Sequence, residues 1–81
     1  MALRFLRLPA VIERTGFSRS AIYARASAGL FPRPVPLGLR TAAWPEHEVE
    51  EVLKAYLREA PDHEMKALVI QLRERRRSEL P

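Results

Sequence analysis

The chain has 81 residues, no cysteine and a formal net charge of +4. This length suits one small domain with a thin core, which would gain stability by self-association. The lack of cysteine excludes disulfides, thiolate zinc sites and cysteine nucleophiles. The chain also holds no apolar run long enough for a signal peptide or a membrane span, so we expect a cytoplasmic protein without a membrane partner.

The charge is unevenly distributed along the chain. Up to Thr41 there are seven arginines and a single acidic residue, Glu13, whereas from Ala42 onward nine acidic residues outnumber seven basic ones. An arginine-rich proteome would explain the type of basic residue but not this segregation. A basic half joined to a mildly acidic half is typical of a protein with one face for nucleic acid.

A short first helix is predicted near the N-terminus. Arg4–Leu8 is too short for a helix and is expected to be an extended lead-in. Pro9 fits the first position of a helix, where its missing N–H costs nothing. The helix then covers Ala10–Arg14 and ends at Thr15-Gly16, because glycine readily adopts the left-handed conformation that closes a helix.

A second helix is predicted directly after it, over Arg19–Ala28. Ser18 is a good N-cap for this helix, and Phe17 before the cap can pack on Ile22 in the first turn. Gly29 supplies the left-handed residue at the C-terminal end. Two short helices joined by a few residues that include a glycine are typical of a helix-turn-helix.

A small β-hairpin is predicted next. Leu30–Pro36 contains three prolines, so this segment is excluded from a helix and would be poor as a central strand. Val35–Leu37 and Ala42–Trp44 flank Gly38–Thr41, which we interpret as the turn. Arg40 then lies at or near the tip of a hairpin with the shape of a wing.

A third, amphipathic helix is predicted after the hairpin. Pro45 fits its first position, and the acidic residues that follow favour a helix N-terminus. Pro61 ends it. With this helix to close the core, the segment 1–60 is expected to be a complete domain. Its apolar stripe has spacings of three and four residues and consists of Val49, Val52, Leu53, Tyr56 and Leu57.

A fourth helix, capped by Asp62, is predicted within the segment 61–81. This helix can fold back on the domain, pair with a second copy or bind another protein. An exposed apolar stripe is a liability, so we expect it to be an oligomerisation element that forms a homodimer or a DNA-assisted oligomer. The arginines at its end can contact phosphates or simply solubilise it. The stripe consists of Met65, Leu68, Val69 and Leu72, and the arginines are Arg73, Arg75, Arg76 and Arg77.

Over residues 5 to 58 the chain resembles the AlpA family of prophage regulators, within the larger MerR-like and excisionase-like winged-helix group. This resemblance implies a mainly α fold, with a helix-turn-helix, a two-stranded wing and a packing helix. It also implies a protein that activates or represses prophage genes, often an integrase, or bends DNA during excision. The matching residues are Leu8-Pro9, Val11–Ser20, Ile22-Tyr23, Gly29, Phe31-Pro32, Pro34-Val35, Leu37-Gly38, Arg40 and Trp44.

The chain departs from the family pattern in three places. Ala24 stands where the family often has arginine, and Arg25 stands where an apolar residue is common. At 100° per residue, Arg25 falls beside Ile22 and Ala26 on the face expected to be buried. Either its stem covers the core while its head reaches solvent, or the helix has a different phase there. The third departure is the helix after Pro61.

The second helix of a helix-turn-helix presents its N-terminal part to base edges in the major groove. Arg19 can bind guanine O6 and N7 together, or be a solvated first-turn arginine. Ser20 can bond to a base or a phosphate, and Tyr23 can contact a phosphate or sugar, or edge the core. Arg40 is a candidate for a phosphate or a narrow minor groove, or is a plain turn arginine. The candidate DNA-binding residues are Ser18, Arg19, Ser20, Tyr23, Ser27 and Arg40.

Enzyme interpretations find little support. His47 and His63 are each flanked by acidic residues, but adjacent helical positions point in different directions, so neither trio forms a metal site or a catalytic dyad. No glycine-rich phosphate loop is present. Trp44 is expected in the core. We therefore expect no cofactor, no metal and no small-molecule ligand.

The leading hypothesis is a nucleoid-associated transcriptional regulator of phage or mobile-element type that binds double-stranded DNA sequence-specifically. Two alternatives remain open. One is an excisionase-type protein that shapes DNA, and the other is a helix-turn-helix assembly module of a phage packaging protein. Sequence dependence of DNA binding distinguishes the regulator from the assembly module, because a regulator prefers its own site over random duplex by orders of magnitude.

Overall fold

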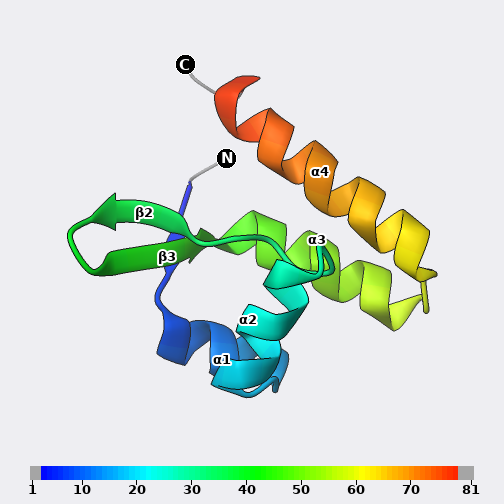
Figure 1. The fold of residues 1–81 in the computed structure, drawn as a ribbon, viewed down its shortest axis with the longest axis horizontal. Helices are drawn as coiled ribbons and strands as arrows, with labels where there is room; N and C mark the ends of the chain where they lie inside the picture. The colour runs from blue at the N-terminus through cyan, green and yellow to red at the C-terminus, as the bar shows by residue number, and fades with distance from the viewer. Residues whose placement is uncertain (1–2, 79–81) are drawn as a thin grey trace.

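The computed structural model describes residues 3–78, which form four helices and a small three-stranded sheet (Figure 1). The outer ends of the two segments predicted at 1–60 and 61–81 therefore lie outside the described residues. The mainly α winged-helix fold is confirmed. The elements are β1 (Phe5–Leu6), α1 (Leu8–Thr15), α2 (Arg19–Ser27), β2 (Val35–Gly38), β3 (Thr41–Pro45), α3 (Glu46–Leu57) and α4 (Asp62–Ser78).

The first two helices form the predicted helix-turn-helix, with bounds within one residue of those expected. Gly16 adopts a left-handed conformation (φ 77°), and its N–H donates to the carbonyl of Ile12 at 2.8 Å, which ends α1. Ser18 caps α2, because its Oγ accepts a hydrogen bond from the Ala21 N–H at 3.1 Å. Gly29 follows α2 and is also left-handed (φ 79°). The cap and stop residues therefore set both helices.

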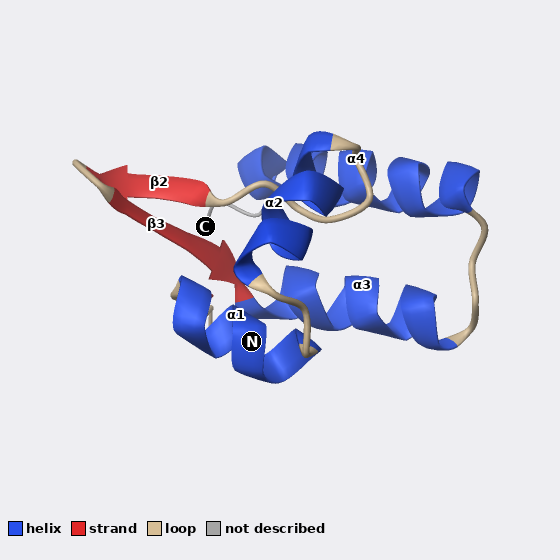
Figure 2. Cartoon of the chain, turned by 60° about the horizontal axis from the view of Figure 1, so that its bottom comes forward, coloured by secondary structure: helices blue, strands red, loops and turns tan. Residues whose placement is uncertain are grey.

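The sheet has one strand more than the two-stranded wing that the sequence predicts. The extended lead-in forms β1, which pairs antiparallel with β3 so that Leu6 lies opposite Trp44. The strand order is β1-β3-β2, so the hairpin of β2 and β3 carries β2 at the edge. An edge strand tolerates Pro36, whose missing N–H needs no partner there. The hairpin projects away from the helices as a wing (Figure 2).

Trp44 lies at the centre of the core, as expected. Its side chain is fully buried, and its Nε1 donates to the carbonyl of Pro32 at 2.9 Å. This bond ties the end of β3 to the proline-rich loop that precedes β2. The other large buried side chains come from β1, from every helix and from that loop: Leu6, Val11, Ile22, Phe31, Val49, Val52, Met65 and Leu72.

Two expectations for the third helix are wrong. Pro45 ends β3 and occupies the N-cap, with a ψ of 129°, so the helix begins one residue later at Glu46. Leu57 does not join the buried stripe, because it is 85% exposed. Ala55 is buried instead, along with Val49 and Val52. The face of α3 that meets the core thus includes Ala55 in the last turn, whereas Leu57 points into solvent.

The expectation that residues 1–60 form a complete core, with an exposed apolar stripe after it, is also wrong. The helix α4 doubles back along α3 (Figures 1 and 2). Met65 and Leu72 are only 1% and 2% exposed, and Leu68 and Val69 pack partly buried against the same core. The stripe is covered within the chain because the helix-turn-helix and α3 alone leave one side of a thin core open. This finding removes the stripe as an argument for a dimer.

The burial of α4 predicts a large difference between two apolar residues two positions apart. Leu72→Ala should lower the free energy of unfolding by about 2–5 kcal/mol, because it leaves a cavity in the core. Ile70→Ala, at an exposed position on the same helix, should change it by less than about 0.5 kcal/mol. Urea unfolding followed by tryptophan fluorescence measures both. Equal, small effects would mean that α4 does not belong to the cooperative core.

Candidate nucleic-acid interface

The exposed face of α2 carries the residues that the sequence singles out. Ile22 and Ala26 are buried, which turns the opposite side of the helix outward. The helical phase was therefore predicted correctly. The Oγ of Ser18 accepts the capping hydrogen bond from the Ala21 N–H, so this residue positions α2, and its side chain is itself exposed at the start of the helix. The exposed polar residues are Arg19, Ser20, Tyr23 and Ser27.

Tyr23 and Arg19 form a small cluster on this face. The Tyr23 ring makes an edge contact with Trp44, with centroids 6.0 Å apart and an interplanar angle of 63°. The guanidinium of Arg19 lies 5.9 Å from the centroid of the Tyr23 ring. Tyr23 thus both edges the core and stays exposed on the surface. The buried tryptophan supports the tyrosine, and the tyrosine in turn lies beside the arginine.

Arg25 resolves as the first of its two alternatives, a side chain that covers the core. Its guanidinium lies 4.4 Å from the Phe17 ring centroid and 5.2 Å from that of Tyr56. Its Nη1 donates to the Tyr56 hydroxyl at 3.0 Å, and that hydroxyl donates to the carbonyl of Leu30 at 2.7 Å. These contacts tie the C-terminal end of α2 to α3. The sequence shows no signal for this cluster, because its members are far apart along the chain.

The wing presents Arg40 at its turn, as predicted. Leu39 and Arg40 form the turn, and both side chains are exposed. Arg40 has a φ of 58°, in the left-handed region that non-glycine residues adopt at a cost of roughly 1–2 kcal/mol. The turn imposes this conformation. The wing carries Arg40 away from the helical body (Figure 1), so Arg40 and α2 form separate parts of the candidate interface.

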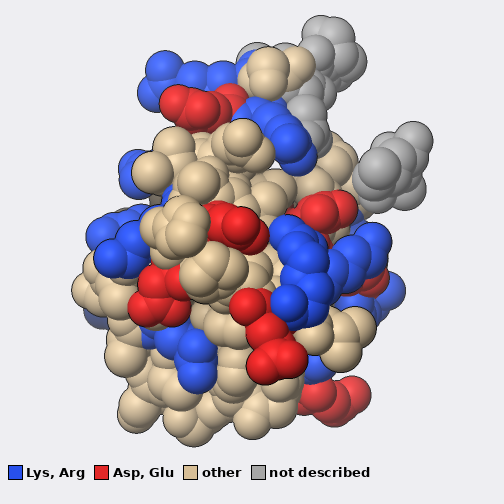
Figure 3. Space-filling view, turned by 90° about the vertical axis from the view of Figure 1, so that its right-hand side faces the viewer, with Lys and Arg blue, Asp and Glu red and all other residues tan. Residues whose placement is uncertain are grey.

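The positive charge of the N-terminal half is partly neutralised by acidic residues of the same chain. Arg14 bonds to Glu46 at 2.8 Å and to Glu50 at 3.3 Å, and the hydrogen bond to Glu46 raises the pKa of Arg14 above its usual value. Arg4 lies 4.0 Å from the same Glu46 carboxylate. The end of the molecule opposite the wing carries basic and acidic side chains interspersed (Figure 3). That face therefore lacks the single sign of charge expected of a DNA surface.

Between residues 3 and 78, no group of three histidine or acidic side chains is arranged to hold a metal ion. Within the same range, none of the helices has both the length and the apolar character needed to cross a membrane.

Comparison with known proteins identifies the family. The family described as "Prophage CP4-57 regulatory protein (AlpA)" matches residues 4–57. The chain belongs to the AlpA family. It is similar to the DNA-binding transcriptional activator AlpA of Escherichia coli K12, with 40% identity over 58 residues, which cover 64% of this chain and 83% of that protein. No solved structure matches the chain significantly.

A second relative comes from a phage. The chain is 48% identical over 46 residues to the uncharacterized protein ORF88 of Enterobacteria phage P4, which covers 57% of this chain and 52% of the phage protein. The chain thus spans about half the length of that relative. The AlpA-family match ends with α3, so α4 lies beyond it.

The helix beyond the AlpA-family match supports the site through a buried ion pair. Glu48 of α3 is 1% exposed, and Arg76 of α4 bonds to both of its carboxylate oxygens, at 2.9 Å through Nε and 2.6 Å through Nη2. The same Nη2 donates to the carbonyl of Arg33 at 2.7 Å. Arg33 lies in the loop between α2 and the wing, so one guanidinium joins α3, α4 and that loop. The sequence predicted only a phosphate-binding or solubilising role for this arginine.

The ion pair predicts that Arg76→Ala is strongly destabilising. Removing the guanidinium leaves the Glu48 carboxylate buried without a partner, which should lower the free energy of unfolding by about 3–5 kcal/mol. The neighbouring variant Arg77→Ala, at an exposed position, should stay within about 0.5 kcal/mol of the wild type. Chemical unfolding at neutral pH measures both.

A double variant tests whether the cause is the unpaired charge. Glu48→Leu combined with Arg76→Met replaces the pair by apolar side chains of similar size and should recover most of the lost stability. A double variant as unstable as Arg76→Ala alone would contradict this account and would assign the loss to the Arg33 contact instead.

Proposed function

We propose that this protein is a transcriptional regulator of prophage or mobile-element type that binds double-stranded DNA sequence-specifically. The observation that carries the proposal is the pairing of an exposed polar face on α2 with a projecting wing that ends in Arg40. Membership of the AlpA family supports it, as does the similarity to a protein named a DNA-binding transcriptional activator. Two short helices joined by a turn, with a hairpin beside them, are a common means of docking on duplex DNA.

In this proposal α2 reads the major groove. Arg19 stands in the first turn of the helix and offers a planar fork of donors that fits the O6 and N7 atoms of guanine. Its position beside the Tyr23 ring limits the conformations it samples, so less entropy is lost on binding. Ser20 and Tyr23 add hydroxyl contacts to bases or phosphates. Ser27 lies at the other end of the helix, nearer the sugar-phosphate backbone of the DNA.

The wing makes the second contact. Arg40 reaches a phosphate or the minor groove beside the major-groove site, because the hairpin holds it away from the body of the domain. The left-handed backbone of Arg40 sets the direction in which its side chain leaves the turn.

A second candidate function, DNA bending of the excisionase type, is favoured by one observation. Leu39, next to Arg40, is 96% exposed at the tip of the wing. Exposed apolar side chains that enter the minor groove can unstack a base step and kink the duplex. Gel mobility of circularly permuted fragments decides between the two: a bend at the bound site supports the architectural role, and straight DNA supports regulation by occupancy.

The major-groove assignment predicts a selective effect of Arg19→Ala. The variant should lose about 1–3 kcal/mol of binding free energy on the specific site and almost nothing on random duplex, because base contacts carry the specificity. A footprint over DNA flanking the gene locates the site, and fluorescence anisotropy then measures both affinities. An equal loss on both kinds of DNA would make Arg19 a phosphate contact.

Arg40→Ala should behave differently from Arg19→Ala. As a wing contact to phosphate, it should weaken binding to all duplexes and make the plot of log affinity against log salt shallower by about one unit. Arg58→Ala is the matched control, since Arg58 is exposed at the end of α3. A loss that depends on A·T content beside the site would instead show that Arg40 reads groove width, and no loss would exclude the wing from the interface.

A further inference from the structure

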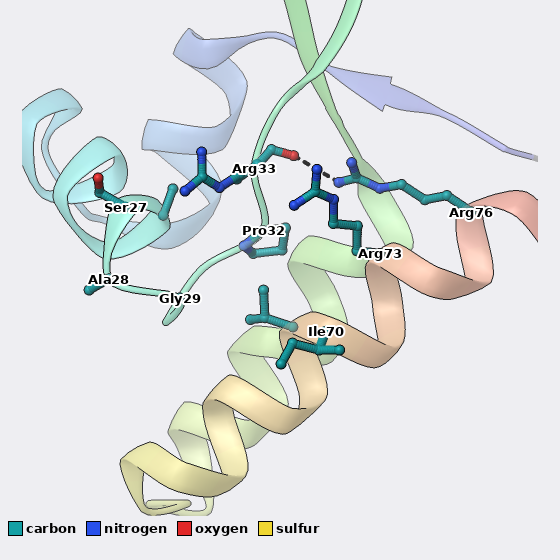
Figure 4. A pocket seen from close by; sticks show the side chains of 10 residues that line it. Ser27, Ala28, Gly29, Pro32, Arg33, Ile70, Arg73 and Arg76 are labelled. Atoms are coloured by element: carbon teal, nitrogen blue, oxygen red, sulfur yellow. Dashed lines mark hydrogen bonds between the residues drawn. The ribbon is translucent and has the colours of Figure 1, made fainter.

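A cavity of about 250 Å³ opens where the C-terminal end of α2 meets α4. Its polar lining includes Ser27 on α2, Arg33 on the loop after it, and Arg73 and Arg76 on α4 (Figure 4). Three guanidinium groups from two distant parts of the sequence therefore surround one hollow.

These three arginines are not equally neutralised. Arg76 is paired with Glu48 at 2.6 Å. Among the residues that the structure describes, by contrast, no carboxylate lies within ion-pair distance of Arg33 or Arg73. Both side chains are exposed, so water solvates and screens their charges. They therefore remain available to bind an anion.

The cavity is continuous with the exposed face of α2. A neighbouring hollow is lined by Tyr23, Ser27 and Arg33 together with Ala26 and Pro34, so the two hollows share Ser27 and Arg33. In Figure 4 the side chain of Arg33 extends toward Ser27, while Arg73 rises from α4 to the same loop. An extended anion that lies along α2 would therefore reach Arg33 and Arg73 without leaving the surface.

We propose that Arg33 and Arg73 bind a backbone phosphate of the DNA duplex at the C-terminal end of α2. The arginine fork matches the geometry of phosphate oxygens, and the Ser27 hydroxyl offers a further donor. This site extends the interface onto α4, beyond the part of the chain that the family matches. The proposal rests on the proposed function, because it requires that α2 lie against duplex DNA.

Arg76 serves this site as a positioning residue. Its bond to the carbonyl of Arg33 holds the loop, so the Arg33 side chain starts from a fixed point. Its own charge is already engaged by Glu48, so it does not provide the anion contact. The apolar side of α4 fixes the helix in the core, and Arg73 is thereby held at the rim of the cavity.

The test compares three variants of the full chain with matched charge loss. Arg33→Ala and Arg73→Ala should each weaken binding to specific and random duplex by a similar factor, and each should make the salt slope shallower by about one unit. Arg75→Ala, which removes an equal charge from an exposed position of α4 outside the cavity lining, should change neither quantity. Thermal unfolding of each variant verifies that it folds.

A second measurement locates the phosphate. Neutral methylphosphonate linkages are placed one at a time around the footprinted site. At one flanking position the substitution should weaken wild-type binding as much as Arg73→Ala does, and should weaken the binding of that variant no further.

Four outcomes overturn the proposal. Equal effects of Arg73→Ala and Arg75→Ala would reduce the site to general electrostatics, and no effect of either cavity arginine would remove it; in both cases a selective Arg19→Ala effect leaves the proposed function standing. Failure of the wild type to bind any duplex would overturn both. In the fourth outcome, millimolar inorganic phosphate stabilises the wild type against thermal unfolding but does not stabilise the cavity variants, and these variants bind DNA as the wild type does. That result would assign the cavity to a free anion instead.

Discussion

A carboxylate buried in a small protein must be paired and hydrogen-bonded, because the cost of removing an ion from water amounts to several kcal/mol. Glu48 is such a buried carboxylate, and its partner is Arg76, which lies 28 residues later in the sequence. The pair forms only when α4 lies along α3. The same guanidinium holds the carbonyl of Arg33, so the loop between α2 and the wing is fixed by the charge that neutralises the core.

The arginines named above fall into two groups. Arg14, Arg25 and Arg76 contact groups of the same chain, namely carboxylates, aromatic rings or a tyrosine hydroxyl. Arg19 and Arg40 stand on the surface of α2 and the wing. The net charge therefore overstates the basic surface, and the face for DNA depends on where the unpaired guanidiniums lie rather than on how many arginines the chain contains.

Local signals in the sequence predict most of the fold up to the wing. Gly16 and Ser18 determine where α1 ends and α2 begins, because left-handed backbone and N-capping are properties of single residues and their neighbours. The β1 strand was missed, since a two-residue strand has no periodicity and is defined only by its pairing with β3. The helical phase of α2 placed Tyr23 and Ser27 outward correctly.

Tertiary contacts explain what local signals could not predict. Leu57 has the spacing of a buried residue, but the face of α3 that meets the core passes through Ala55 and leaves Leu57 in solvent. The stripe of α4 was predicted correctly as apolar, but it is covered within the chain, whereas a second copy was expected to cover it. Periodicity shows which side of a helix is buried without showing what covers it. In the sequence, Glu48 is an ordinary acidic residue of a first helical turn. Its burial depends on the ion pair with Arg76, which only the tertiary structure shows.

The Glu48–Arg76 pair also limits how far the DNA-binding segment can be treated as an interchangeable module. The family match ends with α3, yet one of its residues, Glu48, is completed by a side chain outside the match. Grafting residues 4–57 onto a different C-terminal extension would bring a bare carboxylate into the core. A working chimera would need either α4 transferred with the segment or an apolar residue substituted at position 48, so the two ends of the chain are constrained to change together.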